Sequence, residues 1–315
     1  TRLCALADGA RVVLGKGGET AILPGSLDDL AAVLEENPQA TVIAGATDVG
    51  LWVTKFLRPI SPAVFIGQLE ELRRIETDEP EVRIGAGVSY SGFEAVVAAH
   101  FPHLAEYWDR IAGWQVRNMG TIGGNIANGS PIGDTPPLLI ALDTHITLRR
   151  GAETRTLPLQ DFFIEYGKQD RRPGEFLETI RIPKPGKSTA IRAYKISKRF
   201  DQDISAVLAA FAFDIEGRQV RSARIAFGGM AGIPARAAKA ESAVSGLSLD
   251  DPSGWNAATD ALKADFTPMS DHRASAGYRM QVAQGLLHKA LTETAGAPSG
   301  TVRVAGLRET ADAGA

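Results

Sequence analysis

A glycine-rich segment at residues 118–137, NMGTIGGNIANGSPIGDTPP, constrains the fold more than any other part of this sequence. Glycine has no Cβ, so a chain rich in it can bring main-chain N–H groups close to an anion and adopt backbone angles that are closed to other residues. The segment holds five glycines, with hydroxyl, amide and carboxylate side chains between them. This combination predicts a segment that binds the ribityl chain and the pyrophosphate of a dinucleotide.

A mobile surface loop is the alternative interpretation of the same segment, because clusters of Gly, Ser, Asn and Pro are typical of loops. However, long stretches without regular structure are uncommon inside a compact domain unless they are functional or disordered. Ile122, Ile126 and Ile132 recur through the segment as anchors onto a core. We therefore favour ligand binding. The segment is not a Rossmann fingerprint, since no strand runs directly into G-x-G-x-x-G with a helix behind it.

Length and charge exclude several classes of protein. At 315 residues the chain is too long for one typical core, which predicts two or three subdomains. A net charge of −3 without a run of basic residues argues against a nucleic-acid partner, and no apolar stretch is long enough to span a membrane. The chain begins at Thr1 without a signal-peptide pattern, so we expect a cytoplasmic protein.

Cysteine usage limits the metal chemistry of the chain. Cys4 is the single cysteine. It excludes an internal disulfide framework, and it excludes a four-cysteine iron–sulfur cluster held by this chain alone. We predict no metal site in this chain.

The sequence pattern of the N-terminal part predicts a small parallel βαβ unit over residues 21–67, preceded by a linker at residues 1–20. A strand at residues 21–23, a helix capped by Ser26 and a strand at residues 41–44 follow one another. The second strand opens into GATDVG, residues 45–50, before a helix at residues 51–56. Such a strand, loop and helix start can present N–H groups to a phosphate. A tight turn with Thr47 or Asp48 as helix cap explains this segment alone equally well.

The remaining chain predicts two further units in an α+β fold. Residues 68–183 mix antiparallel strands with helices, and residues 190–296 form a C-terminal unit with a hairpin and helices; the tail at residues 297–315 is expected to be disordered. The elements expected are hairpins at 73–77 with 82–85, 145–149 with 154–157 and 207–215 with 220–227, a strand at 176–182, and helices at 90–100, 104–114, 235–245, 255–266 and 273–294.

Four motifs together resemble the FAD-binding portion of the xanthine dehydrogenase (molybdenum hydroxylase) family, and most of all the small subunit of the bacterial two-subunit enzymes. They are AGATDV (Ala44–Val49), TIGGNIANGSPIGD (Thr121–Asp134), YKISKRFDQDIS (Tyr194–Ser205) and IAFGGMAGIPARA (Ile225–Ala237). The match covers residues 20–296 in the family's order. Four motifs in register make a chance resemblance improbable, whereas each one alone is modest support.

The resemblance implies a two-part FAD-binding domain followed by a small three-stranded antiparallel domain with helices. In that family FAD receives electrons from two [2Fe–2S] clusters, which receive them from a molybdopterin-bound molybdenum centre, and FAD passes them as hydride to NAD⁺. The expected partners are therefore an iron–sulfur unit and a molybdenum-binding subunit, in a hetero-oligomer. Xanthine dehydrogenase is the favoured member, carbon monoxide and aromatic-substrate hydroxylases share the architecture, and a non-catalytic nucleotide-binding module is the alternative from another class.

The resemblance also assigns cofactor-binding residues by motif position. The first motif with its strand would line the pyrophosphate, ribityl and adenine side of FAD, the second would line the other side, Leu177 and Ile111 would lie near the flavin ring, and Lys195 would approach the cofactor from the C-terminal unit. The full set is Val42, Ala44, Gly45, Ala46, Thr47, Asp48, Val49, Ile111, Thr121, Gly124, Asn125, Ala127, Gly133, Asp134, Leu177 and Lys195. Residues 199–203 would flank the nicotinamide side of the flavin.

Some of these residues have a simpler interpretation or depart from the family. Without the motif, Lys195 is expected to be a solvated strand lysine, and the charges at residues 198–203 a surface ion-pair cluster. Ala46 replaces the second glycine of the family's A-G-G-T-D, which is tolerable provided that the position does not need a positive φ. Ile111 replaces the aromatic residue of animal relatives, so no stacking on the flavin is expected there.

Overall fold

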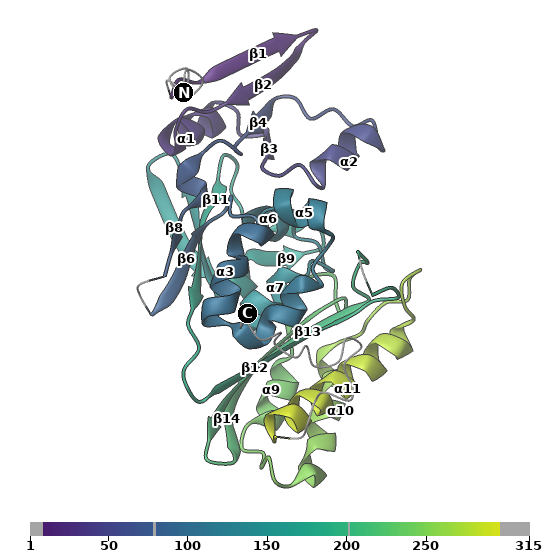
Figure 1. Ribbon diagram of the computed structural model, residues 1–315. Helices are drawn as coiled ribbons and strands as arrows, with labels where there is room; N and C mark the ends of the chain where they lie inside the picture. Colours follow the sequence, from purple (N-terminus) through teal and green to yellow (C-terminus); the bar gives the residue numbers. More distant parts are fainter. Residues whose placement is uncertain (1–8, 78–79, 201, 297–315) are drawn as a thin grey trace, which may run out of the picture.

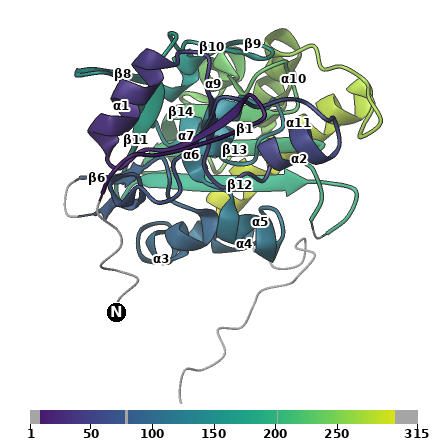
Figure 2. The same cartoon turned by 90° about the horizontal axis from the view of Figure 1, so that it is seen from above.

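The structure, a computed structural model, describes residues 9–77, 80–200 and 202–296 (Figure 1). Three units follow one another along the molecule, with the N-terminal unit at one end and the C-terminal unit at the other. Seen along this stack, helices α3 (Tyr90–His100), α4 (Ala105–Asp109) and α5 (Trp114–Met119) of the middle unit lie along one side (Figure 2). No helix in the described ranges combines the length and apolarity needed to cross a membrane.

The N-terminal unit is a four-stranded sheet in the order β1-β2-β4-β3. Strands β2 (Glu19–Leu23) and β3 (Thr41–Ile43) both run parallel to β4 (Ala63–Phe65), which lies between them. Helix α1 (Leu27–Glu36) begins at Ser26, whose hydroxyl accepts the N–H of Asp29, and it buries one apolar face that includes Leu30 and Leu34. The predicted parallel unit is confirmed, with β4 inserted between its two strands.

The prediction of a linker at residues 1–20 is wrong for the part that the structure describes near its end. Strand β1 (Val12–Lys16) pairs with β2 in an antiparallel hairpin, so this part of the chain belongs to the sheet. All five residues of β1 are exposed. A strand without a buried face lacks the alternation of apolar and polar residues from which strands are predicted. Residues 1–8 and the predicted disordered tail at 297–315 lie outside the described residues.

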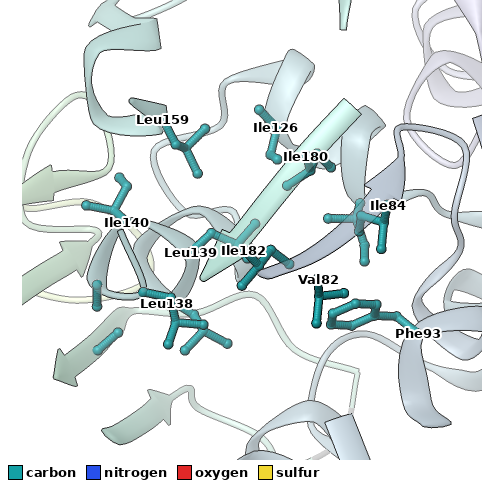
Figure 3. Close-up of a cluster of buried hydrophobic side chains, with 14 of the residues drawn as sticks. Val82, Ile84, Phe93, Ile126, Leu138, Leu139, Ile140, Leu159, Ile180 and Ile182 are labelled. Atoms are coloured by element: carbon teal, nitrogen blue, oxygen red, sulfur yellow. The ribbon is translucent and has the colours of Figure 1, made fainter. Parts of the chain in front are cut away.

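The middle unit is a five-stranded antiparallel sheet in the order β5-β6-β11-β7-β8. Its strands are β5 (Ile75–Glu76), β6 (Glu81–Gly85), β7 (His145–Arg150), β8 (Glu153–Pro158) and β11 (Phe176–Pro183). Both predicted hairpins are present, and β11 pairs with one strand of each. Helices on one face complete the core, a cluster in which Ile182 of β11 lies by Leu139 and Phe93 lies by Val82 (Figure 3).

The helix expected at residues 104–114 is wrong in its extent. A short 3-10 turn (Pro102–Leu104) leads into α4, which ends at Asp109, and α5 begins only at Trp114. Between them Ala112 has a φ of 52°, a left-handed conformation that a right-handed helix does not contain. Other short elements of the middle unit are the 3-10 helix η2 (Glu70–Arg73), α8 (Leu159–Phe162), β9 (Phe163–Glu165) and β10 (Lys168–Gln169).

The C-terminal unit is an antiparallel sheet in the order β12-β13-β14-β15. It contains β12 (Thr189–Ile196), β13 (Val207–Glu216), β14 (Gln219–Gly228) and β15 (Ala235–Arg236), then α9 (Ala238–Val244), the 3-10 helix η4 (Pro252–Gly254), α10 (Trp255–Asp265) and α11 (Ala276–Thr294). The expected three strands are thus joined by a fourth, β15, which is only two residues long and too short to show a strand pattern.

Strand β13 joins the C-terminal unit to the middle unit, because both of its faces are buried. Phe211 and Phe213 point into the core formed with the helices of the C-terminal unit. Leu208, Ala210 and Ala212 alternate with them and belong to the core of the middle unit. This alternation places opposite side chains on opposite faces of the sheet, so the two units share one continuous apolar contact.

Candidate functional site

Two segments far apart in the sequence meet at Gly45. A side chain at this position would overlap the main-chain carbonyl of Met119, so only glycine allows the approach. Thr47 in the same loop lies close to Gly120. The loop after β3 and the glycine-rich segment, which the sequence motifs assign to one site, are therefore neighbours in the fold.

The loop after β3 presents unpaired donors. Within the described residues, the main-chain N–H groups from Gly45 to Val49 donate to no protein acceptor. The loop ends in α2 (Val49–Thr54), whose N-cap residue Asp48 makes no side-chain capping bond. The simpler interpretation, a turn capped by Thr47 or Asp48, is therefore not supported. Consecutive N–H groups around a left-handed residue form a concave site that suits an anion.

Ala46 is the left-handed residue of this loop, with a φ of 56°. The condition under which alanine was expected to replace the family's glycine without cost is therefore not met. The side chain of Ala46 is exposed, so the chain tolerates the conformation without a steric clash. The strain remains local to the loop.

The glycine-rich segment is not an extended loop. It forms α6 (Ile122–Asn128), which ends at Gly129 in the left-handed conformation, and it continues into α7 (Thr135–Ala141). The N–H groups of all five glycines donate to the protein: those of Gly120, Gly123, Gly124, Gly129 and Gly133 bind the Val116, Ala86, Thr121, Ile126 and Ser130 oxygens. The N–H groups of the five glycines themselves are thus used within the protein, and contact of this segment with an anion stays a prediction.

The glycines serve close packing and access instead. A side chain at Gly123 would overlap Ala86 of the neighbouring loop, which explains a glycine inside a helix that packs tightly on the core. Gly124 is exposed, and a Cβ there would meet only the hydroxyl of Thr121. Together with exposed Ala127 one turn later, Gly124 leaves an open strip on α6 that a flat or chain-like ligand can approach.

Thr121 and Asn125 are held by protein contacts. The hydroxyl of Thr121 accepts the N–H of Gly124 and caps α6. The carbonyl oxygen of Asn125 accepts the hydroxyl of Thr135 at 2.5 Å, which ties α6 to α7. The amide nitrogen of Asn125 has no acceptor among the described residues, and it is the group that Asn125 can offer to a ligand.

Lys195 is buried, with only 1% of its side chain exposed, so the expectation of a solvated strand lysine is wrong. Its ammonium group donates to Asp134 at 2.5 Å and to Ser205 at 3.1 Å. The hydroxyl of Ser205 in turn donates to Asp134 at 2.6 Å. The motif residue of the C-terminal unit is thus brought to the motif residue at the end of the glycine-rich segment.

Tyr107 of α4 also contacts Asp134, at its main chain. Its hydroxyl donates to the main-chain oxygen of Asp134 at 2.5 Å. Burial, and secondly the negative charge of Asp134, raise the pKa of Tyr107 well above its ordinary value. The phenol therefore stays protonated and remains a donor throughout the physiological range.

The other residues assigned to the cofactor lie in or against the hydrophobic cores of the middle and N-terminal units. Ile111 and Leu177 are buried in the core of the middle unit, and Val42 and Ala44 pack partly buried on the N-terminal core. The structure therefore brings Ile111 and Leu177 into one core, while their contact with a flavin ring remains a prediction.

Arg199 and Asp203 form an exposed ion pair, as in the alternative interpretation, whereas Asp201 lies outside the described residues. Arg199 pairs with Asp203 at 3.1 Å, and the Arg199 side chain is 74% exposed. Lys198 donates to the carbonyl oxygen of His272. A cavity of about 430 Å³ lies here, lined by Lys198, Arg199, Asp203, Ile204, Ala206, His272 and Arg273.

Sequence reasoning missed three residues that organise the site: Tyr107, Arg110 and Ser205. Arg110 donates to the carbonyl oxygen of Lys195 at 2.9 Å, and its guanidinium lies over the ring of Phe200. Ser205 stood at the end of a quoted motif, so its position was a usable signal. Tyr107 and Arg110 belong to no motif, and nothing in the local pattern marks them.

Comparisons with known proteins match two family models to this chain. Residues 17–185 match the family described as the FAD binding domain in molybdopterin dehydrogenase, and residues 192–294 match the CO dehydrogenase flavoprotein C-terminal domain. The glyceraldehyde dehydrogenase medium chain of Sulfolobus acidocaldarius is 32% identical, over 86% of this chain and 96% of that one. Nicotinate hydroxylase of Emericella nidulans is 33% identical over 84% of this chain, which spans 21% of that protein's length.

A solved structure gives the same result for the fold. The carbon monoxide dehydrogenase of Hydrogenophaga pseudoflava contains a chain that superposes with a TM-score of 0.80 at 30% identity, covering 85% of this chain and 94% of that one.

Proposed function

Because the chain belongs to the family of FAD-binding domains of molybdopterin dehydrogenases, we propose that it carries FAD as the electron-transfer component of a xanthine dehydrogenase-like molybdenum hydroxylase. Electrons would arrive from [2Fe–2S] clusters on a partner unit and leave to NAD⁺. Relatives named for glyceraldehyde, nicotinate and carbon monoxide make another molybdenum hydroxylase the alternative. The substrate is chosen by the molybdenum-binding partner in this proposal.

The loop from Gly45 to Val49 is the observation that carries the proposal. Its N–H groups donate to no acceptor among the described residues, and unpaired donors of this kind fit the pyrophosphate of a dinucleotide. The open strip at Gly124, and the amide nitrogen of Asn125, which has no acceptor among the described residues, suit the rest of the cofactor. FAD, once bound, supplies the hydride and single-electron chemistry, while the protein binds and orients it.

Exposed apolar side chains support a role as one part of a larger assembly. Helices α2 and α5, which begin and end beside the two loops of the site, have no buried residue. Phe56 after α2 and Trp114 and Met119 of α5 are all more than half exposed. Large apolar side chains at the surface are typical of sites that a ligand or partner covers, and we propose that the iron–sulfur partner docks beside the cofactor here.

The charged loop at residues 198–203 supports NAD⁺ as the acceptor in this proposal. Its cations and the cavity beside them offer a nicotinamide dinucleotide a polar approach to the site.

Cofactor retention tests the first step. We expect the purified chain to bind one FAD without a covalent bond, since no His or Cys lies in either loop, and to release it on acid denaturation. Gly124→Val should abolish retention, because a branched side chain would occupy the open strip on α6. Gly285→Val in α11, at an exposed helical glycine with open space around it, is the matched control and should keep full FAD. Flavin in purified Gly124→Val would refute this placement.

Reduction by NADH tests the acceptor. The FAD-loaded chain should lose its flavin absorbance with NADH and reduce an artificial dye, since that reaction needs only the two rings to be aligned. Xanthine oxidation should require the added iron–sulfur and molybdenum partners. A flavin that NADH leaves oxidised would reject NAD⁺ as acceptor, and a chain that binds FAD but exchanges no electrons with any donor would be a non-catalytic binding module.

A further inference from the structure

Three side chains from different parts of the chain form a closed triangle of hydrogen bonds beside the proposed cofactor site. Asp134 is the N-cap residue of α7, Lys195 lies in β12, and Ser205 lies in the loop before β13. Asp134 accepts from Lys195 at 2.5 Å and from Ser205 at 2.6 Å, one bond on each carboxylate oxygen. Lys195 closes the triangle by donating to Ser205 at 3.1 Å.

Ser205 has no freedom within this triangle. It is 2% exposed, its one proton is committed to Asp134, and its oxygen accepts from Lys195. The main chain at this position is also held, because the N–H of the next residue, Ala206, donates to Ile196. A hydroxyl that is fixed at both ends determines the rotamers of the two charged groups that it joins.

Lys195 keeps one donor that the protein does not use. An ammonium group has three N–H donors, and only the bonds to Asp134 and Ser205 are formed among the described residues. A buried N–H without an acceptor is costly, so this donor is suited to a ligand. Its direction depends on where Ser205 and Asp134 hold the other two.

We propose that Ser205 is a positioning residue for the cofactor, which acts by aiming the third N–H of Lys195 at bound FAD. The proposal rests on the FAD binding proposed above. In this proposal the C-terminal unit contributes one buried positive charge to the site. The charge is the ammonium group of Lys195 in β12, and the hydroxyl of Ser205, in the loop between β12 and β13, orients it. Asp134 balances this charge and keeps it next to the glycine-rich segment.

Ser205→Ala, Ser205→Thr and the control Ser222→Ala test the proposal by titration of the apoprotein with FAD, followed by flavin fluorescence. Ser222 also donates to a carboxylate, that of Asp214, in the same sheet, but on its exposed edge away from the site. We expect roughly tenfold weaker FAD binding for Ser205→Ala, as for a lost hydrogen bond to a charged group. Ser205→Thr, which keeps the hydroxyl, should restore affinity, and Ser222→Ala should match the wild type.

A second measurement separates positioning from general loss of structure. Charge near the flavin ring tunes its electronics, so a misdirected Lys195 should lower the reduction potential of the FAD that Ser205→Ala retains. In a double-mutant cycle with Lys195→Met, the effect of Ser205→Ala on FAD affinity should largely disappear, since it acts through Lys195.

The outcomes are distinct. Wild-type affinity in Ser205→Ala, or a lower melting temperature with unchanged affinity and potential, overturns the proposed role of Ser205. Additive effects in the cycle do so as well, and if Lys195→Met does not fold, the two Ser205 variants decide. A wild-type chain that binds no FAD would instead contradict the proposed function.

Discussion

Replacing Ala46 by glycine should stabilise this protein, although the change removes a methyl group from the proposed cofactor loop. Ala46 has a φ of 56°, and a left-handed conformation costs an L-residue roughly 1–2 kcal/mol. The greater freedom of glycine in the unfolded chain offsets about 0.5–1 kcal/mol of that gain. The methyl group is exposed, so its loss forfeits little packing. We expect a net gain of about 0.5–1 kcal/mol in the free energy of unfolding.

Urea denaturation of the apoprotein, followed by tryptophan fluorescence, measures this change, because Trp52 lies in α2 directly after the loop. Ala257→Gly is the matched control: this exposed alanine lies in α10, where glycine costs roughly 1 kcal/mol. The two substitutions should therefore shift the midpoint in opposite directions. If Ala46→Gly lowers the midpoint as Ala257→Gly does, the left-handed conformation of Ala46 is not strained and the reasoning fails. FAD affinity should be retained, since the N–H groups stay in place.

Three further predictions follow from the contacts of single residues. Gly45→Ala should separate the two loops by its clash with Met119 and abolish FAD retention, whereas Gly50→Ala, which has open space, should keep the cofactor; equal retention by both would contradict the contact. Arg155→Gln should destabilise the fold by about 3 kcal/mol at neutral pH in urea denaturation, because it leaves Glu175, 3% exposed, without its guanidinium partner. Burial pushes the pKa of Glu175 up, but the hydrogen bonds and charges of Arg155 and Arg172 together outweigh it and hold that pKa below its usual range. The wild type should therefore lose stability as the pH falls below about 4.5, where carboxylates begin to protonate, and Arg155→Gln should show a weaker slope; an equally steep acid transition in both would reject this.

The pattern of local residues was sufficient for much of the fold. The cap at Ser26, the hairpin around residues 216–217 and the helix at residues 90–100 each depend on residues a few positions apart. Their signals are complete within one short window, so propensity and periodicity suffice. The four motifs added the family, and with it the pairing of the two loops that meet at Gly45.

Other features could not be predicted, because they depend on contacts that no local window contains. The glycine-rich segment was expected to bring main-chain N–H groups to an anion, yet the N–H groups of its five glycines bond to protein oxygens, among them those of Ala86 and Thr121. Exposed strand β1 showed no alternation, and the break at Ala112 lay inside a helical pattern.

The sequence by itself determined the units, most of their elements and the segments that form the site. Only the tertiary structure decided that the side chain of Lys195 is buried. Its local sequence favoured a solvated side chain. Asp134 lies 61 residues before it and Ser205 ten residues after it, and burying the ammonium group is favourable only once both have been brought into contact with it. A buried charge is stable when its partners are in place, and those partners are positioned by the packing of the C-terminal sheet on the middle unit.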